Sequence, residues 1–209
     1  MFDLNDRRHF LSVALLFEGG LALLAFVLGF ATGVNPVRWL IWKWEAAVWG
    51  IGGALPLFAF FVLAYVAPLR ALQEIKRFLL EVLGPALAAC RWYDLILVAL
   101  FAGIGEELLF RGWLQVWLEN WGATFALIGS NVVFGLAHFI TPLYAVVAGL
   151  LGLYLGVLFD ATGERNLLVP IVTHALYDYL GFLVVVRTWR RTHLPPPPAE
   201  DTAEAGASA

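Results

Sequence analysis

Acids and bases that could carry out chemistry occur in three short segments of an otherwise apolar sequence. The residues concerned are Glu106, Glu107, Arg111, His138, His174 and Asp178. Ionisable groups are costly inside apolar segments, so each needs a partner, a water-filled cavity or a chemical role. Glu107 and Arg111 are four residues apart and would share one face of a helix, where they can neutralise each other. Glu106 lies about 100° further round that helix, so no local partner accounts for it.

Glu106 and the two histidines have the chemistry needed to activate water. A carboxylate can take a proton from water, and a histidine, with an unperturbed pKa of about 6.5, can share or return that proton. His174 and Asp178 are one helical turn apart, which allows either a hydrogen bond between them or two metal ligands on one face. Together these residues predict a water-activating site inside the apolar segments.

A metal ion is a second way in which the same residues could activate water. One glutamate, two histidines and an aspartate would suit zinc with a water molecule in an open coordination position. The sequence has no H-E-x-x-H motif, and its one cysteine, Cys90, excludes a Cys-rich zinc site and a disulfide framework. Zinc chemistry and glutamate/histidine chemistry without a metal are both open alternatives.

The composition indicates that a lipid bilayer surrounds the helices that position these residues. Of 209 residues, 61% are hydrophobic and 14% are charged, against roughly 45–50% and roughly 25% in soluble domains. This balance excludes an ordinary water-soluble globule, and a net charge of −3 gives no basic surface for nucleic acid. We therefore expect an all-α, polytopic transmembrane helical bundle.

Six apolar segments are candidates for membrane spans, because a helix needs about 20 mostly apolar residues to cross a bilayer. They are Phe10–Ala31, Ala46–Ala67, Tyr93–Leu118, Thr124–Phe139, Leu143–Phe159 and Leu167–Val186. The fourth and fifth are short for a span. The three chemical segments lie on the third, fourth and sixth.

Lysine and arginine are distributed unevenly between the two ends of the expected spans. One end carries Arg7, Arg8, Arg70, Lys76, Arg77, Arg91, Arg187, Arg190 and Arg191, and the other carries Arg38, Lys43 and Arg165. Cytoplasmic loops of membrane proteins are enriched in these residues. We therefore expect a multi-pass protein of the cell (inner) membrane with both termini in the cytoplasm.

The connection between the second and third spans has the pattern of an amphipathic helix. Arg70, Glu74, Arg77 and Glu81 recur every three or four residues, opposite a face of leucine, isoleucine and valine. This pattern predicts a helix lying on the cytoplasmic membrane surface. Residues 1–190 are expected to form the transmembrane domain, with 93–186 as its motif-bearing core, and residues 191–209 a disordered tail rich in proline and alanine.

The order of the three chemical segments resembles that in the CPBP family of intramembrane proteases. This family includes the CAAX prenyl endopeptidases and bacteriocin-processing or immunity-associated membrane proteins. The motifs are Glu106-Glu107-x-x-x-Arg111, Phe134-x-x-x-His138 and His174-x-x-x-Asp178, and the resemblance covers about residues 95–180. The contexts Phe110-Arg111-Gly112 and Asn166-Leu167-Leu168-Val169-Pro170 are also typical of the family.

The resemblance implies that Glu106 and His138 activate the attacking water and that His174 and the residue four positions later support the oxyanion. Glu107 and Arg111 would orient the site. The family often has asparagine at the last position, where this sequence has Asp178. An ionised aspartate cannot donate a hydrogen bond, so Asp178 would be protonated, orient His174 or bind a metal.

The leading functional hypothesis is an intramembrane endopeptidase of the CAAX type, a hydrolase acting on a membrane-associated or prenyl-type peptide. Its partners would be membrane lipids and a peptide or protein substrate. Two alternatives are a non-catalytic scaffold or bacteriocin-immunity-type protein and a proton-coupled carrier. In the carrier, Glu18 of the first span would join Glu106 and the histidines in a relay; a position near the lipid headgroups or a buried hydrogen bond is the simpler interpretation of Glu18.

Overall fold

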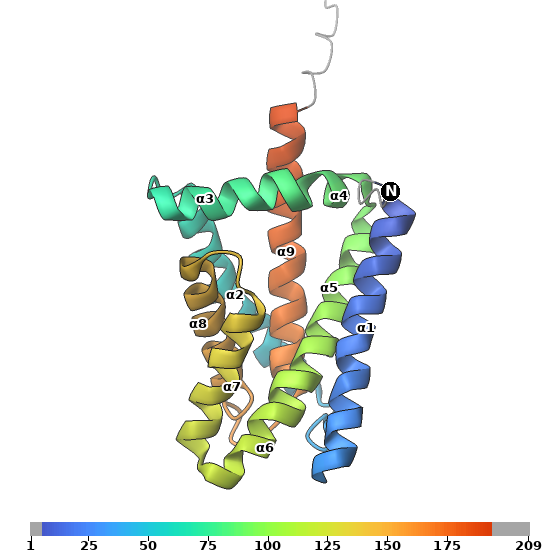
Figure 1. The fold of residues 1–209 in the computed structure, drawn as a ribbon, viewed down its shortest axis with the longest axis vertical. Helices are drawn as coiled ribbons and strands as arrows, with labels where there is room; N and C mark the ends of the chain where they lie inside the picture. The colour runs from blue at the N-terminus through green and yellow to red at the C-terminus, as the bar shows by residue number, and fades with distance from the viewer. Residues whose placement is uncertain (1–5, 194–209) are drawn as a thin grey trace, which may run out of the picture.

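Each of the six apolar segments forms a helical rod, and the rods run roughly side by side along the long axis of the molecule (Figure 1). The computed structural model describes residues 6–193, and no strand occurs among them. The rods are α1 (Arg7–Thr32), α2 (Trp44–Val66), the rod that begins with α5 (Trp92–Glu107), α7 (Ala123–Ala137), α8 (Pro142–Leu158) and α9 (Leu168–His193). The all-α prediction is confirmed.

Length distinguishes the rods that can cross a membrane by themselves. α1, α2 and α9 have 26, 23 and 26 residues and are apolar enough to span. The rod that begins with α5 continues through a π-helical stretch, η2 (Leu108–Gln115), and the short turns α6 (Val116–Leu118) and η3 (Glu119–Trp121). It is a fourth candidate when taken with the helix before it, from which it is bent by 120°. α7 and α8, with 15 and 17 residues, fall short of about 20, so length supports three or four of the six predicted spans.

The predicted amphipathic helix lies across one end of the bundle (Figure 1). It comprises α3 (Arg70–Phe78), a π-helical stretch η1 (Leu79–Leu83) and α4 (Gly84–Ala89). Its path is nearly perpendicular to the rods, as expected of a helix at a membrane surface. Gly84 packs directly against the indole of Trp189 on α9, so this helix is held to the bundle as well as to the adjoining rods.

Glycines bring three rods close together near the C-terminal end of α5. A side chain at Gly103 would meet Ala175 and the Ile171 carbonyl of α9, and a side chain at Gly105 would collide with the Glu18 carbonyl of α1. Small residues permit such close backbone approach in membrane bundles. Gly103 and Gly105 therefore admit a neighbouring helix on each of two sides of α5.

Polar side chains fasten the end of the bundle opposite α3. Asn166 forms two hydrogen bonds with the main chain of Ile41. Its Oδ1 atom accepts from the Ile41 N–H at 3.4 Å, and its Nδ2 atom donates to the Ile41 carbonyl oxygen at 3.0 Å. Lys43 Nζ lies 2.6 Å from Glu164 Oε2, and this contact lowers the pKa of the Glu164 carboxyl. These contacts connect the loop before α2 to the loop before α9.

The two ends of the described chain lie at the same end of the bundle, beside α3 and α4 (Figure 1). The N-terminal end of α1 is fixed there by Arg7, whose guanidinium donates to both carboxylate oxygens of Asp94 at 2.6 Å. α9 continues through His193, so the first three residues of the expected tail 191–209 are helical. The remainder of that tail lies outside the described residues.

Candidate active site

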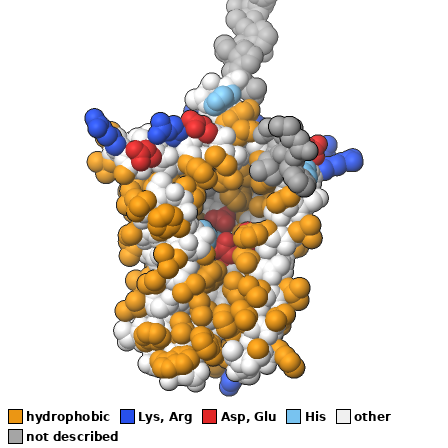
Figure 2. Space-filling view, in the orientation of Figure 1, with side chains coloured by type: hydrophobic (Ala, Val, Ile, Leu, Met, Phe, Trp, Pro, Cys, Tyr) orange, Lys and Arg blue, Asp and Glu red, His pale blue; other side chains and the backbone are white. Residues whose placement is uncertain are grey.

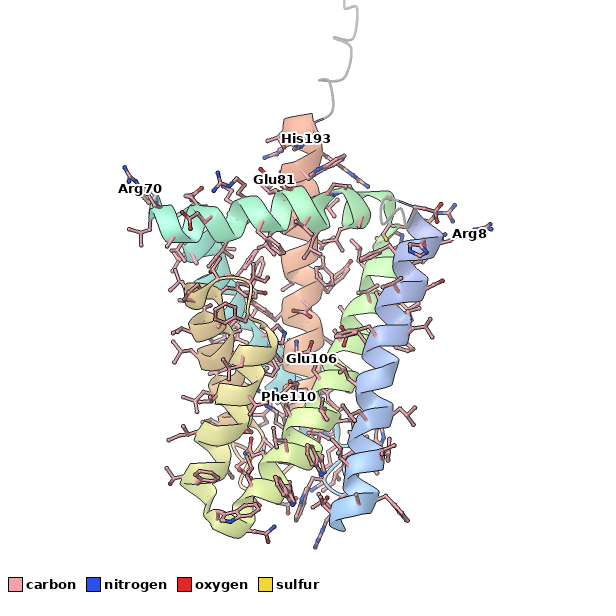
Figure 3. All side chains as sticks on the ribbon, viewed as in Figure 1. Arg8, Arg70, Glu81, Glu106, Phe110 and His193 are labelled. Carbon is pink, nitrogen blue, oxygen red and sulfur yellow. The ribbon has the colours of Figure 1, made fainter. Side chains whose placement is uncertain are left out.

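A cavity of about 360 Å³ lies inside the bundle and contains both predicted histidines and two of the predicted acids. Its lining includes Glu106, His138, His174 and Asp178. Figure 2 shows acidic and histidine side chains at the bottom of a hollow that hydrophobic side chains surround. Glu106 lies about halfway along the bundle (Figure 3). The structure thus brings together four residues from three helical segments that are far apart in sequence.

Glu106 faces both histidines across short gaps. Its Oε2 atom is 3.6 Å from Nε2 of His138 and 3.9 Å from Nε2 of His174. These distances exceed that of a direct hydrogen bond, and Glu106 Oε2 is buried without a hydrogen-bond partner. The spacing suits a water molecule that donates to the carboxylate while lying within reach of an imidazole nitrogen.

His138 is oriented by its own helix, at whose C-terminus it lies. Its Nδ1 atom is 2.9 Å from the carbonyl oxygen of Phe134, and the two rings stack with centroids 4.4 Å apart. Because Nδ1 donates to that carbonyl, the lone pair of neutral His138 is on Nε2, the atom that faces Glu106. The four-residue spacing of Phe134 and His138 therefore sets the direction of the imidazole.

Glu107 and Arg111 form the ion pair predicted from their spacing, and both side chains are fully buried. The Arg111 Nη1 atom donates to Glu107 Oε1 at 2.8 Å. The same carboxylate oxygen lies 2.8 Å from Nδ1 of His174 on α9. Glu107 consequently connects the guanidinium of its own helical rod to a histidine of another helix.

Arg111 has three further contacts that the sequence did not reveal. Its Nη2 atom donates to Asn131 Oδ1 at 2.9 Å and to the Gly152 carbonyl at 2.6 Å. Its guanidinium also lies over the Phe134 ring, 4.7 Å from the centroid. Arg111 lies in the π-helical stretch η2, and such stretches are frequent at functional sites. Asn131 shares a helical stripe with His138, but nothing local identifies it as the partner of Arg111.

Asp178 lies beside His174 without a direct hydrogen bond. The distance from His174 Nε2 to Asp178 Oδ2 is 3.5 Å, beyond the usual range for nitrogen and oxygen. The i, i+4 pair inferred from sequence is therefore close in space, while the hydrogen bond of His174 is made to Glu107. Both acids flank the same imidazole.

Further polar residues line the cavity, among them Glu18 and Tyr144. Glu18 reaches it from α1, and Tyr144 reaches it from the first turn of α8. From the sequence, the simpler interpretation of Glu18 is a headgroup position or a buried hydrogen bond, whereas the structure places Glu18 in the cavity with Glu106. Tyr144 carried no signal, because a tyrosine near the end of an apolar helix is ordinary.

The positions of the potential ligands decide whether a metal ion fits the cavity. In the part of the chain from 6 to 193, no group of three or more histidine, cysteine, aspartate or glutamate side chains is arranged to hold a metal ion. The Nδ1 atoms of His138 and His174 are engaged with a carbonyl and a carboxylate, which leaves Nε2 of each ring as the nitrogen that could face a metal ion. The arrangement does not support zinc as the resident cofactor.

Comparison with known proteins gives one family. Residues 88–180 match the family model described as Rce1-like, type II CAAX prenyl endopeptidase. The matched stretch includes Glu106, His138, His174 and Asp178, and it excludes all of α1 and α2. No curated protein and no solved structure matches the chain.

Proposed function

We propose that the chain, whose residues 88–180 match the Rce1-like family of type II CAAX prenyl endopeptidases, is an intramembrane endopeptidase that uses Glu106 and His138 to activate water. The observation that carries this proposal is the convergence of Glu106 with both histidines, at 3.6 Å and 3.9 Å, in one cavity. A packing ion pair would bring opposite charges into direct contact, as Glu107 and Arg111 do.

In the proposed reaction, Glu106 takes a proton from water as the water oxygen attacks the carbonyl carbon of the scissile peptide bond. His138, with its Nε2 lone pair directed at the same place, shares that proton and assists its delivery to the leaving nitrogen. The carbon–nitrogen bond breaks, and the products are a carboxylate and an amine.

We propose that His174 and Asp178 stabilise the negative oxygen formed during attack. Because Nδ1 of His174 bonds to Glu107, its Nε2 atom donates a hydrogen bond only when the ring is an imidazolium. The carboxylate of Glu107, 2.8 Å from Nδ1, favours that charged form. Asp178 donates a second hydrogen bond in its protonated form.

The apolar part of the cavity supports a membrane-associated substrate with a lipid-like chain. The cavity extends from Glu106 to the inner face of the surface helix, where Leu72, Ile75, Leu79 and Leu83 line it. An isoprenoid attached to a peptide would bury apolar surface there. We propose a prenylated peptide as the substrate, entering from the membrane.

The basic end of the bundle is the proposed cytoplasmic end. Both ends of the described chain and the surface helix with Arg70 and Arg77 lie there (Figure 3), in agreement with the positive-inside rule. Arg77→Cys and Lys43→Cys, each introduced separately in a Cys90→Ser background, test this orientation. An impermeant maleimide applied to intact cells should label the cysteine at position 43 and leave that at position 77 unlabelled; the reverse pattern contradicts the orientation.

The activity is tested with purified protein in lipid vesicles and a quenched fluorescent peptide that carries a farnesylated cysteine, compared with the same peptide without farnesyl. Glu106→Gln and His138→Ala should each lower the rate of cleavage by about 10²–10⁴-fold. Glu45→Gln, at an exposed position in the first turn of α2, is the matched control and should cleave normally. Cleavage by Glu106→Gln at the wild-type rate would contradict the proposal and favour a scaffold or immunity role.

A further inference from the structure

Glu18 is a carboxyl group inside the cavity that the proposed mechanism does not use. It lies in the middle of α1, outside the segment that matches the family. Its Oε2 atom is buried without a hydrogen-bond partner, and no ion pair among residues 6–193 includes it. The guanidinium of Arg111 is engaged by Glu107, Asn131 and Gly152 and is not among the side chains that line the cavity.

The position of Glu18 relative to Glu106 is fixed by backbone packing. Gly105, the residue before Glu106, lies so close to α1 that a side chain there would collide with the Glu18 carbonyl oxygen. α1 and α5 run side by side (Figure 1), and Arg7 and Asp94 hold them together at the α3 end. Glu18 therefore enters the cavity next to the carboxyl proposed to activate water.

An unpartnered carboxyl oxygen in an apolar cavity is unfavourable, because it has lost water and gained no protein donor. A peptide entering the same cavity has a complementary need: its main-chain N–H groups also lose water and require acceptors. A carboxyl beside the reacting centre can satisfy such a group and hold the chain in register.

We propose that Glu18 is a substrate-positioning residue, whose carboxyl accepts a hydrogen bond from a main-chain N–H of the peptide close to the scissile bond. This inference rests on the proposed endopeptidase function. It also gives a role to an acid on a helix that carries none of the motif residues.

Binding is measured separately from catalysis in the inactive Glu106→Gln background. The probe is the farnesylated peptide, titrated into protein in vesicles. Adding Glu18→Leu should raise the dissociation constant about 10- to 100-fold, the effect of a hydrogen bond to a charged group. Adding Glu18→Gln, which keeps an acceptor oxygen, should change it by only a few-fold, and Glu45→Gln should leave it unchanged.

A set of peptides, each N-methylated at one bond near the scissile bond, identifies the donor. At one position, methylation should weaken binding to the Glu106→Gln protein and cause no further loss once Glu18→Leu is present, because both changes remove the same interaction. Additive losses at every position would overturn the proposal.

Stability provides a readout that distinguishes positioning from a structural role. Glu18→Leu removes a buried oxygen that has no partner, so it should maintain or raise the melting temperature while weakening binding. A lower melting temperature with unchanged binding would assign Glu18 to packing. Failure of Glu18→Gln to bind better than Glu18→Leu would also overturn the proposal. Absence of cleavage by the wild type would contradict the endopeptidase function itself. The binding measurements do not depend on cleavage, so the two failures are distinguishable.

Discussion

The Nδ1 atom of His174 lies 2.8 Å from Oε1 of Glu107, and the same oxygen accepts a hydrogen bond from Arg111 at 2.8 Å. One fully buried carboxylate thus holds an imidazole on α9 and a guanidinium on its own helical rod. Since Arg111 is also bonded to Asn131 and Gly152, the orientation of His174 depends on contacts with α7 and α8. The site is a network that extends across four rods.

Removing the guanidinium from this network should be strongly destabilising. We expect Arg111→Met to lower the free energy of unfolding by about 3–5 kcal/mol, because Glu107 is left as a buried charge without its cation. Unfolding in mixed detergent micelles measures this change. The double variant Glu107→Leu/Arg111→Met should recover much of the stability and still fail to cleave, because His174 has lost its acceptor. A double variant as unstable as Arg111→Met would argue against an uncompensated charge.

The contact between Gly105 and the Glu18 carbonyl should make even one added methyl group costly. Gly105→Ala forces α1 away from α5, and we expect a loss of about 1–3 kcal/mol, as in other overpacked interiors. Gly20→Ala is the matched control, because a side chain at Gly20 meets no atom within 4 Å and alanine favours a helix over glycine. Melting temperatures of the two variants compare them directly, and equal values would show that α1 is not held at this point.

The contrast between these contacts and the sequence shows what residue patterns can predict. The runs of apolar residues identify the rods, and the i, i+4 spacing identifies the Glu107 and Arg111 pair, because both depend on local helical geometry. The spacing of His174 and Asp178 allows a hydrogen bond between them or two metal ligands on one face. In the structure the hydrogen bond of His174 is made to Glu107. That choice depends on how α5 and α9 are rotated against each other. The rotation is set by close packing at Gly103, which no short segment encodes.

The same reason explains why Glu18 was not assigned to the site from sequence. Its depth along α1 could be estimated from the helical rise, but its direction depends on which side of α1 meets α5. The short lengths of α7 and α8 were visible in the sequence. Their packing against each other, with the Gly135 position touching the Ala145 carbonyl, follows only from the folded bundle.

Asp178→Asn tests whether this residue supports the oxyanion as a hydrogen-bond donor. An aspartate donates only when protonated, and asparagine donates through its amide at every pH. The wild-type rate should therefore fall as the pH rises through the pKa of Asp178, and the ratio of variant to wild-type rate should increase over the same interval. Cleavage of the farnesylated peptide across a pH series measures that ratio. A ratio that is constant with pH contradicts a donor role for Asp178.

Removal of metal ions should leave cleavage unchanged. In the described part of the chain no three potential ligands are arranged to hold a metal ion. We expect the rate to be the same before and after treatment with 1,10-phenanthroline, with elemental analysis of the active protein giving well under one zinc per chain. The isomer 1,7-phenanthroline, which does not chelate metal ions, is applied to the same protein in parallel and controls for effects of the compound on the vesicles. Loss of activity with chelator and its recovery with added zinc would show that the cavity rearranges to bind a metal, and would replace Glu106 and His138 as water activators by a zinc-bound water.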